Sequence, residues 1–502
     1  MVKFEVICSL RYTKRTMNTS STQDQKHIHI IGICGVLTSA LASAFHHAGW
    51  KVTGSDKGFF PPVSTQLEKL GISFYAGWHP EKMVAGGAPD IVVVATASGS
   101  QNPETAYALA NGLKMLSPTE VIREYLVAPK SIVCAGTWGK TTSSALLSFI
   151  LIHADLDPAY MFGGISLSHE LSAMMSSQKS EWSVLEGDEY KSGPTDNTAK
   201  FFYYKPTHLL LSAVSWDHAD LYPTEASYVE TFKKLLHTVP NPGAPNGGRI
   251  LTCIDAPLLN TLVNQANLPH ITYGKDAQAQ YRYEHIRQSK EGLIFDIVHD
   301  GKKFEVQSPL LGEYNVENIT GCFAMAHEIG VPVEKILSGI AGFKGMKRRL
   351  ERRLESADGA ITIIDDIAHS PEKAKSVLAN IRNIYAGTKI YAVFEPNIGG
   401  RQRESAGKYD EAFNDADEVI VPRLTKLKID GDSAVQPMEG DELASVIART
   451  HKNTLYISDD ETLVKHLIQR AHSGTESSAV IAFLGSHGFR GMIEEAVGKL
   501  KN

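Results

Sequence analysis

One segment constrains the fold of this 502-residue chain more than any other: Ser131-Ile-Val-Cys-Ala-Gly-Thr-Trp-Gly-Lys-Thr-Thr142. The apolar run from Ile132 to Ala135 predicts a buried strand, and Ser143 to Ile152 predicts the helix that follows. In such a unit, backbone N–H groups of the glycine-bounded loop and of the helix N-terminus point at phosphate oxygens. The segment therefore predicts a strand–loop–helix unit that holds a nucleoside triphosphate.

The residue types in this loop predict individual roles. Lys140 is expected to reach the β- and γ-phosphates, and the Thr141 hydroxyl is expected to bind Mg²⁺. The usual pattern has a further glycine where Cys134 stands, so a plain strand–turn–helix with a solvated lysine is the alternative interpretation. The predicted ATP-binding loop residues are Gly136, Thr137, Gly139, Lys140, Thr141 and Thr142.

Two later segments add charged side chains at strand ends. Trp182 to Glu186 predicts a buried strand ending in a carboxylate, where phosphate-loop proteins keep a second Mg²⁺ contact. Thr207 to Val214 predicts another strand, followed by His218 between Asp217 and Asp220. Ligands of α/β sheets bind at the carboxyl ends of the strands. We therefore predict Lys140, Glu186 and His218 as catalytic residues, and Thr141, Glu186 and His218 as metal ligands.

The N-terminal part alternates predicted strands and helices, which favours a parallel, doubly wound sheet. Its first turn, Gly32 to Gly35, is followed 21 residues later by Asp56, close to where a ribose-binding acid lies in a dinucleotide fold. Taken alone, this favours an NAD(P)-dependent dehydrogenase. The triphosphate loop downstream argues against that alternative.

Six blocks in a fixed order resemble the Mur ligases, the ATP-dependent amide-forming enzymes of peptidoglycan synthesis. They are His29-Ile-Ile-Gly-Ile-Cys-Gly35 with Thr53-Gly-Ser-Asp56 and Pro61-Pro62, Gly-Thr-Trp-Gly-Lys-Thr-Thr142, Glu-Gly-Asp-Glu-Tyr190, Asp-His-Ala-Asp220, Leu311-Gly-Glu-Tyr-Asn-Val-Glu-Asn318, and Lys347-Arg-Arg-Leu-Glu351 with Asp365-Asp-Ile-Ala-His-Ser-Pro371. Within the family, the blocks look most like the branch that acts on UDP-N-acetylmuramate, and they lean toward its murein tripeptide ligase.

The resemblance implies an α/β fold of three domains. Residues 27–128 would form a Rossmann-like domain that binds the UDP-sugar, 129–342 a central phosphate-loop ATPase-like domain, and 343–502 a Rossmann-like C-terminal domain. The resemblance places Gly32, Gly35, Ser55 and Asp56 near the sugar nucleotide. Residues 1–26 are polar and basic and lack the apolar core of a signal peptide, so we expect a disordered leader or a true start at Met17.

The resemblance also assigns residues downstream. Asn318 first and Asn315 second would hold adenine, although an asparagine before a helix is also a routine N-cap. Arg349 would reach the ATP phosphates and Asp365 the nucleotide. The acceptor would meet His369, in the turn after Asp365, and Arg401 and Arg403, in a later loop that lacks the histidine of the L-alanine ligases. Some Mur ligases carry a carbamylated lysine near the position of Lys233. The spacing of the apolar residues here places Phe232 at that position instead.

The implied reaction joins UDP-N-acetylmuramate to L-Ala-γ-D-Glu-meso-diaminopimelate through an acyl phosphate, with ATP and Mg²⁺. L-alanine is the alternative acceptor, and a non-catalytic nucleotide-binding protein is a distant alternative function.

Composition agrees with these expectations. The net charge of −6 argues against a nucleic-acid or membrane surface, and no apolar run reaches the length of a membrane span. Five cysteines without a C-x-x-C pair fit reduced thiols in the cytoplasm, where we expect the protein.

Overall fold

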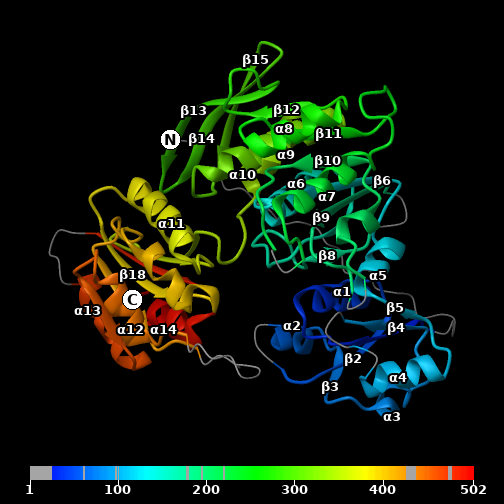
Figure 1. The fold of residues 1–502 in the computed structure, drawn as a ribbon, viewed down its shortest axis with the longest axis horizontal. Helices are drawn as coiled ribbons and strands as arrows, with labels where there is room; N and C mark the ends of the chain where they lie inside the picture. Colours follow the sequence, from blue (N-terminus) through cyan, green and yellow to red (C-terminus); the bar gives the residue numbers. More distant parts are fainter. Residues whose placement is uncertain are drawn as a thin grey trace.

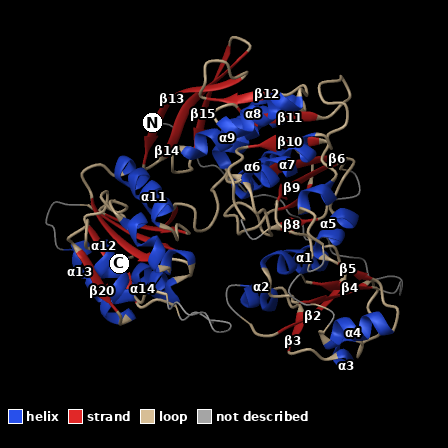
Figure 2. Cartoon of the chain, viewed as in Figure 1, coloured by secondary structure: helices blue, strands red, loops and turns tan. Residues whose placement is uncertain are grey.

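The computed structural model contains three α/β domains, each built on its own sheet (Figure 1). It describes residues 25–59, 63–95, 99, 101–176, 180–193, 196–218, 221–425, 437–472 and 478–501. Figure 2 shows the strands of each sheet flanked by helices, which is the layered arrangement that alternating strand and helix patterns predict. The α/β fold class with Rossmann-like terminal domains is confirmed. The domain boundaries stay predictions, and Pro61, Pro62, Asp220 and most of the leader lie outside the described residues.

The N-terminal domain has a five-stranded parallel sheet in the order β3-β2-β1-β4-β5. Its elements are β1 (His27–Ile31), α1 (Val36–His47), β2 (Lys51–Asp56), α2 (Val63–Lys69), β3 (Ser73–Ala76), α3 (Pro80–Met83), β4 (Ile91–Val94), α4 (Pro103–Ala110), β5 (Met115–Leu116) and α5 (Pro118–Tyr125). The chain order reverses at β1, so the loops after β1 and β4 diverge there and leave a place for a ligand.

The central domain has a ten-stranded sheet in the order β15-β14-β13-β12-β11-β10-β6-β9-β7-β8. Its elements are β6 (Lys130–Ala135), α6 (Lys140–His153), β7 (Ala159–Met161), β8 (Ala173–Met174), β9 (Trp182–Gly187), η1 (Lys200–Tyr204), β10 (His208–Leu211), α7 (Glu225–Leu236), β11 (Arg249–Cys253), α8 (Pro257–Ala266), β12 (Ile271–Gly274), β13 (Tyr281–Ser289), β14 (Gly292–His299), β15 (Lys302–Ser308), α9 (Tyr314–Glu328) and α10 (Val333–Gly342).

The C-terminal domain has a six-stranded sheet in the order β16-β17-β21-β18-β19-β20, parallel except for β16. Its elements are β16 (Glu351–Glu355), β17 (Ile361–Asp366), α11 (Pro371–Ile384), β18 (Lys389–Glu395), η2 (Gly399–Arg401), η3 (Arg403–Tyr409), β19 (Glu418–Pro422), α12 (Gly440–Ile447), β20 (Thr454–Ile457), α13 (Asp460–His472), β21 (Ala479–Gly485), η4 (Phe489–Gly491) and α14 (Met492–Leu500).

Two features of the central domain bear on the site. β15 continues the ten-stranded sheet through antiparallel pairing with β14. α9 begins at Tyr314, so Asn315 and Asn318, the predicted adenine contacts, take helical positions.

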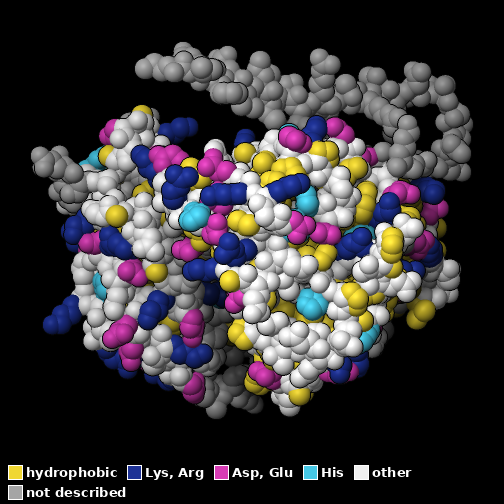
Figure 3. All heavy atoms as spheres, turned by 90° about the horizontal axis from the view of Figure 1, so that it is seen from above, with side chains coloured by type: hydrophobic (Ala, Val, Ile, Leu, Met, Phe, Trp, Pro, Cys, Tyr) yellow, Lys and Arg dark blue, Asp and Glu magenta, His cyan; other side chains and the backbone are white. Residues whose placement is uncertain are grey.

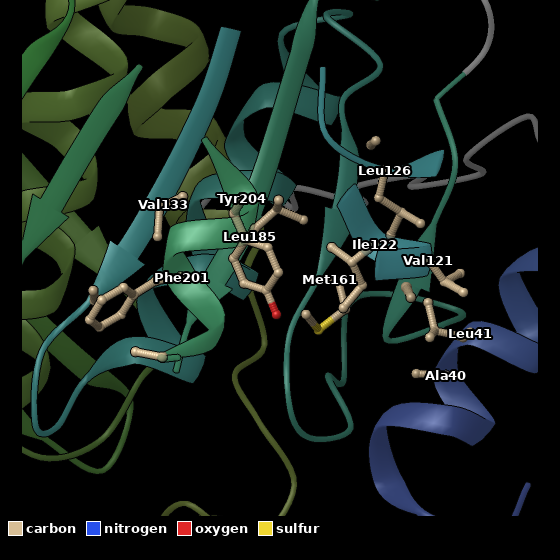
Figure 4. Packing of buried hydrophobic residues seen from close by; sticks show 14 of the residues in the cluster. Ala40, Leu41, Val121, Ile122, Leu126, Val133, Met161, Leu185, Phe201 and Tyr204 are labelled. Carbon is tan, nitrogen blue, oxygen red and sulfur yellow. The ribbon is translucent and has the colours of Figure 1, made fainter. Parts of the chain in front are cut away.

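The core of the N-terminal domain is continuous with that of the central domain. Figure 4 shows side chains of α1 facing those of α5, with Met161 of β7 beside Ile122 of α5. The same buried cluster continues through η1 to β6 and β9. Leu41 and Ile122 are fully buried in this cluster, and so is Leu185. A capping box at Ser117 and Glu120 fixes the start of α5. α5 is therefore one apolar link between the two domains, and the direct packing of α1 against β8 is another.

The surface carries both signs of charge. Figure 3 shows acidic and basic side chains interspersed over the face seen from above. Among the described residues, no helix combines the length and the hydropathy that crossing a bilayer requires.

Replacing Ile122 with alanine should lower the free energy of unfolding by about 2–5 kcal/mol, because it leaves a cavity in this link. Urea unfolding followed by circular dichroism measures the change. Leu109→Ala is the control, because this side chain of α4 is 69% exposed. It should change the free energy of unfolding by less than about 0.5 kcal/mol. Equal effects of the two substitutions would show that α5 does not link the domains.

Candidate functional site

The site is built on three neighbouring parallel strands of the central sheet. β6 pairs in parallel with β9 on one side and with β10 on the other. Their carboxyl ends therefore meet at one edge, where β6 opens into the loop Gly136–Gly139. The segment after β9 and the segment after β10 flank that loop. This edge is where ligands of α/β sheets bind.

The phosphate loop requires both of its glycines. Gly136 has a φ of 132°, and a Cβ there would lie 2.5 Å from Ser212 Oγ. Gly139 has a φ of 79°, and a Cβ there would lie 2.4 Å from Asn318 Oδ1. Only glycine adopts such backbone angles without strain. Cys134, which stands where the longer pattern has glycine, is a buried residue of β6, so its side chain packs in the core.

Lys140, the first residue of α6, points back over this loop. Its Nζ donates to the Gly136 carbonyl at 2.7 Å and to Glu189 Oε2 at 2.9 Å. Glu189 is buried, and its Oε1 also accepts from the Tyr228 hydroxyl at 3.2 Å. Lys140 is thus held by an internal carboxylate and is not a solvated lysine, which argues against the plain strand–turn–helix interpretation.

Glu189 is a residue that the sequence reasoning missed. It follows Glu186 by three positions in the acidic run Glu-Gly-Asp-Glu, and Glu186 was chosen because it ends the apolar strand. β9 ends one residue later, at Gly187, so Glu189 is the carboxylate that extends over the sheet edge. The position of the strand end relative to the acidic run is the signal that would have found it.

Glu186 lies beside the start of α6. Its carboxylate accepts from the Thr141 hydroxyl at 2.8 Å and from the Gly163 backbone N–H at 2.5 Å. Burial raises the pKa of Glu186, while these hydrogen bonds and the Lys140 charge oppose the rise. A hydroxyl and a carboxylate at bonding distance are the oxygen ligands that Mg²⁺ uses.

His218 completes this edge of the sheet. Its Nε2 lies 3.8 Å from Glu189 Oε1, and its ring is 36% exposed. Its backbone has a φ of 53°, which is unusual for a residue other than glycine. The structure therefore brings Lys140, Glu186 and His218 together as the sequence predicted, with Glu189 between Lys140 and His218.

The donor set fits Mg²⁺ in part. The Thr141 hydroxyl and the carboxylates of Glu186 and Glu189 are hard oxygen donors, which suit Mg²⁺. Imidazole suits Zn²⁺ and the later transition metals better. Of the predicted metal ligands, Thr141 and Glu186 thus fit Mg²⁺ well, and His218 fits it less well.

The remaining loop threonines take different positions. The Thr137 hydroxyl donates to the Ser215 carbonyl at 2.9 Å and accepts from the Ser215 N–H at 2.8 Å, which ties the phosphate loop to the segment after β10. Thr142 is half-buried in the first turn of α6. Trp138 is 56% exposed and lies on the outside of the loop.

Asn315 and Asn318 lie one turn apart on α9, against the phosphate loop. Asn315 Nδ2 donates to the Leu311 carbonyl at 2.7 Å, and Asn318 Nδ2 donates to Asn315 Oδ1 at 3.1 Å. The N-cap of α9 is Glu313, so Asn315 is not a capping residue, and that alternative is wrong. The adenine contact stays a prediction for both asparagines.

In the C-terminal domain, Arg348 and Arg349 have different environments. Arg348 Nε lies 3.3 Å from Asp365 Oδ1 and its other nitrogens bond carbonyls after β21, whereas Arg349 is exposed and forms no ion pair with any described residue. Asp365 is buried between Arg348 and Arg353. Arg349 is thus exposed, whereas Asp365 already has two cationic partners, and the ATP contacts of both residues stay predictions.

The three predicted acceptor residues are not equivalent. His369 donates from Nδ1 to the Ile367 carbonyl at 2.7 Å, which leaves Nε2 available. Arg401 is 3% exposed, and its guanidinium bonds the carbonyls of Thr425 and Met438 at 2.9 and 3.0 Å. Arg403 is 56% exposed and pairs with Glu442. Arg401 therefore fixes its loop in this structure, and an acceptor contact would require those bonds to break.

Of the residues predicted to bind the sugar nucleotide, Ser55 bonds a buried carboxylate, Glu104. Ser55 and Tyr75 both donate to Glu104, Tyr75 at 2.6 Å, and the His79 N–H donates to it at 2.7 Å. Burial acts to raise the pKa of Glu104, but these hydrogen bonds outweigh it and lower the pKa. Ser55 is thus engaged internally.

The first turn is held from the strand beside it. Gly32 has a φ of 81°, and its N–H donates to the Ser55 carbonyl at 2.8 Å. Gly35 is the N-cap of α1, and Asp56 accepts from the Cys34 N–H at 2.9 Å. Asp56 therefore orders the turn, and its carboxylate lies beside the backbone of that turn.

Glu317, in the first turn of α9, provides a test by pH. Burial raises its pKa to about 7 from 4.5. Because the folded state holds this proton more tightly than the unfolded chain, stability falls as pH rises from about 4.5 through 7. Glu317→Gln should remove that loss. Its free energy of unfolding should therefore exceed that of wild type by on the order of 1–3 kcal/mol between pH 5 and 8.

Urea unfolding at several pH values measures this difference. Glu313→Gln, at an exposed carboxylate just before the same helix, is the matched control and should follow wild type at every pH. A difference in stability between Glu317→Gln and wild type that does not change with pH would contradict the raised pKa of Glu317.

Three family models match the chain: the Mur ligase family catalytic domain at residues 27–128, the Mur ligase middle domain at 134–326, and the Mur ligase glutamate ligase domain at 348–487. A Haemophilus influenzae UDP-N-acetylmuramate–L-alanyl-γ-D-glutamyl-meso-2,6-diaminoheptandioate ligase is 31% identical over 74% of this chain and 80% of its own. A Chlorobaculum tepidum UDP-N-acetylmuramate–L-alanine ligase is 30% identical over 89% and 90%.

Solved structures have the same fold. The UDP-N-acetylmuramate–alanine ligase of Thermotoga maritima superposes with a TM-score of 0.74 at 22% identity, covering 94% of this chain and 98% of its own. The murein peptide ligase of Psychrobacter arcticus gives a TM-score of 0.65 at 24% identity, covering 95% and 99%. This chain belongs to the Mur ligase family, the ATP-dependent ligases that form amide bonds in peptidoglycan synthesis.

Proposed function

We propose that this chain joins the carboxylate of UDP-N-acetylmuramate to the amine of L-Ala-γ-D-Glu-meso-diaminopimelate, with conversion of ATP to ADP and phosphate. The observation that carries the proposal is the meeting of Lys140, Glu186, Glu189 and His218 at the carboxyl ends of β6, β9 and β10. This edge has a phosphate loop, paired carboxylates and a cation, which are the groups that phosphoryl transfer needs.

The reaction has two steps. An oxygen of the sugar-linked carboxylate attacks the γ-phosphorus, the bond to the β,γ-bridging oxygen breaks, and ADP leaves with an acyl phosphate formed. The acceptor amine then attacks the acyl carbon, phosphate leaves, and the amine loses a proton. Lys140 and the loop N–H groups offset the charge that develops on the phosphoryl oxygens. Arg349, from the C-terminal domain, is proposed to add a second cation.

Mg²⁺ bound by Thr141, Glu186 and Glu189 would neutralise phosphate oxygens and orient them. Lys140 must exchange its bond to Glu189 for one to phosphate when the nucleotide enters, which frees a Glu189 oxygen. His218 lies close enough to Glu189 to orient it or to meet the substrate carboxylate. Phe232 is buried at the position considered for a modified lysine, which supports a site without one.

We propose that the sugar nucleotide binds the N-terminal domain at the Gly32–Gly35 turn, with Ser55 and Asp56 beside it. Asp56 holds this turn through the Cys34 N–H, and Glu104 holds the Ser55 side chain beside it. Reactants would then come from three domains, so closure of the domains is expected to assemble the site and exclude water.

The tripeptide is proposed as acceptor on two grounds. The Haemophilus influenzae relative, which is 31% identical, is named for that peptide. The loop after β18 also lacks the histidine expected in L-alanine ligases, and its Arg401 is turned inward. Arg403 is exposed and pairs with Glu442, and a peptide carboxylate could replace that surface partner.

Phosphate release with ATP, Mg²⁺ and UDP-N-acetylmuramate tests the acceptor. We expect turnover with the tripeptide and at least about tenfold lower kcat/KM with L-alanine, since a lost charged contact costs about 1.4 kcal/mol or more. The product mass must equal the sum of both substrates less water. Preferred turnover with L-alanine would instead assign the first peptide step of the pathway.

Lys140→Ala should lower the rate of phosphate release by about 10²-fold or more, because it removes the main cation at the transferred phosphoryl group. UDP-N-acetylmuramate affinity, measured by calorimetry, should stay within about twofold, since the sugar nucleotide lies in another domain. Lys130→Ala, at an exposed lysine of the same strand, is the control and should keep full activity. Loss of sugar-nucleotide binding in Lys140→Ala would contradict the domain assignment.

A further inference from the structure

A group of side chains that could hold a metal ion lies at the opposite end of α9 from the proposed ATP site. His327 and Glu328 are in its last turn, and His299 is the last residue of β14. One potential ligand atom from each lies within 4.8 Å of the others. The twelve residues from Asn315 to His327 span roughly 18 Å of helix, so this His–His–Glu cluster is separate from the catalytic edge.

The hydrogen bonds around His327 leave one of its nitrogens free. The Tyr281 hydroxyl lies 2.7 Å from His327 Nδ1 and 2.7 Å from Glu328 Oε1. A carboxylate only accepts, so the single phenol proton goes to Glu328 and the phenol oxygen accepts from His327 Nδ1–H. In the neutral ring, Nε2 then carries a lone pair. Tyr281 thus orients two members of the cluster at once.

The same reasoning applies to His299. Its Nδ1 lies 2.9 Å from the Gln280 carbonyl, which only accepts, so Nδ1 carries the proton and Nε2 the lone pair. The His299 ring also stacks on Tyr281, with centroids 3.8 Å apart and planes 5° apart. Metal-binding histidines characteristically donate their other N–H to a carbonyl or another oxygen, which fixes the ring.

The charges around the cluster also bear on a cation. Asp300 Oδ2 lies 3.4 Å from His299 Nε2, in the exposed turn between β14 and β15. A carboxylate oxygen facing an imidazole lone pair is unfavourable unless a proton or a metal ion lies between them. Arg249 Nε is 3.8 Å from Glu328 Oε2, a weak contact that leaves lone pairs of that carboxylate available.

We propose that His299, His327 and Glu328 form a binding site for Zn²⁺ or a similar divalent transition metal, with Asp300 in reach as a fourth ligand. Two imidazoles and a carboxylate suit Zn²⁺, Co²⁺ and Ni²⁺ and do not suit Mg²⁺. The bound ion would fasten the β14–β15 turn to the end of α9. Its role is structural, since the cluster lies away from the phosphate loop.

Titration of the tag-free full-length protein with Co²⁺, without nucleotide, tests this site. Visible absorption should show one tetrahedral Co²⁺ per chain that Zn²⁺ displaces, and Zn²⁺ should raise the melting temperature. His299→Ala and His327→Ala should both lose the absorption and the shift. His270→Ala, at a half-buried histidine of the same domain, is the matched control and should keep both.

Two further variants test whether the absorption comes from this cluster. Tyr281→Phe keeps every ligand and removes the hydroxyl that orients His327 and Glu328, so the Co²⁺ dissociation constant should rise about 10–100-fold. His218→Ala, at the ATP site, should leave the absorption unchanged. Absorption that survives in His299→Ala, that disappears in His218→Ala, or that is absent from wild type at millimolar Co²⁺ would overturn the proposal.

Discussion

The parallel pairing of β6 with both β9 and β10 is the constraint on which the candidate site depends. It places three strand ends at one edge, so that Lys140, Glu186 and His218 meet although the sequence separates them by tens of residues. The two loop glycines are required by the close approach of Ser212 and Asn318. The same sheet continues without interruption to β15, and the proposed metal cluster lies toward that end.

Much of the fold was predictable because its signals are local. The apolar runs of β1, β6 and β9, and the glycine turns after β1 and β6, could be read directly from the sequence. The role of Glu189 could not, since it depends on where β9 ends, nor could the burial of Arg401, which depends on carbonyls from distant loops. Family membership sets aside the dehydrogenase and the non-catalytic alternatives.

Three residues with left-handed backbone conformations lie where ATP is proposed to bind. His218 has a φ of 53°, and Arg348 and Leu350, on either side of Arg349, have values of 59° and 45°. Each such residue costs on the order of 1–3 kcal/mol and persists only when its surroundings hold it. Asp365 and the carbonyls after β21 hold Arg348, and Asp366 holds the Leu350 N–H at 2.7 Å. This framework presents Arg349 outward.

The Lys140–Glu189 ion pair determines what a measured nucleotide affinity would represent. Because the lysine already has an anionic partner, ATP at the proposed site would not meet a bare cation but would replace one counter-ion with another. The affinity would then report the difference between two ion pairs, each at short range in a poorly hydrated place. When the product departs, the carboxylate could take back the ammonium group, so release would leave no charge unbalanced.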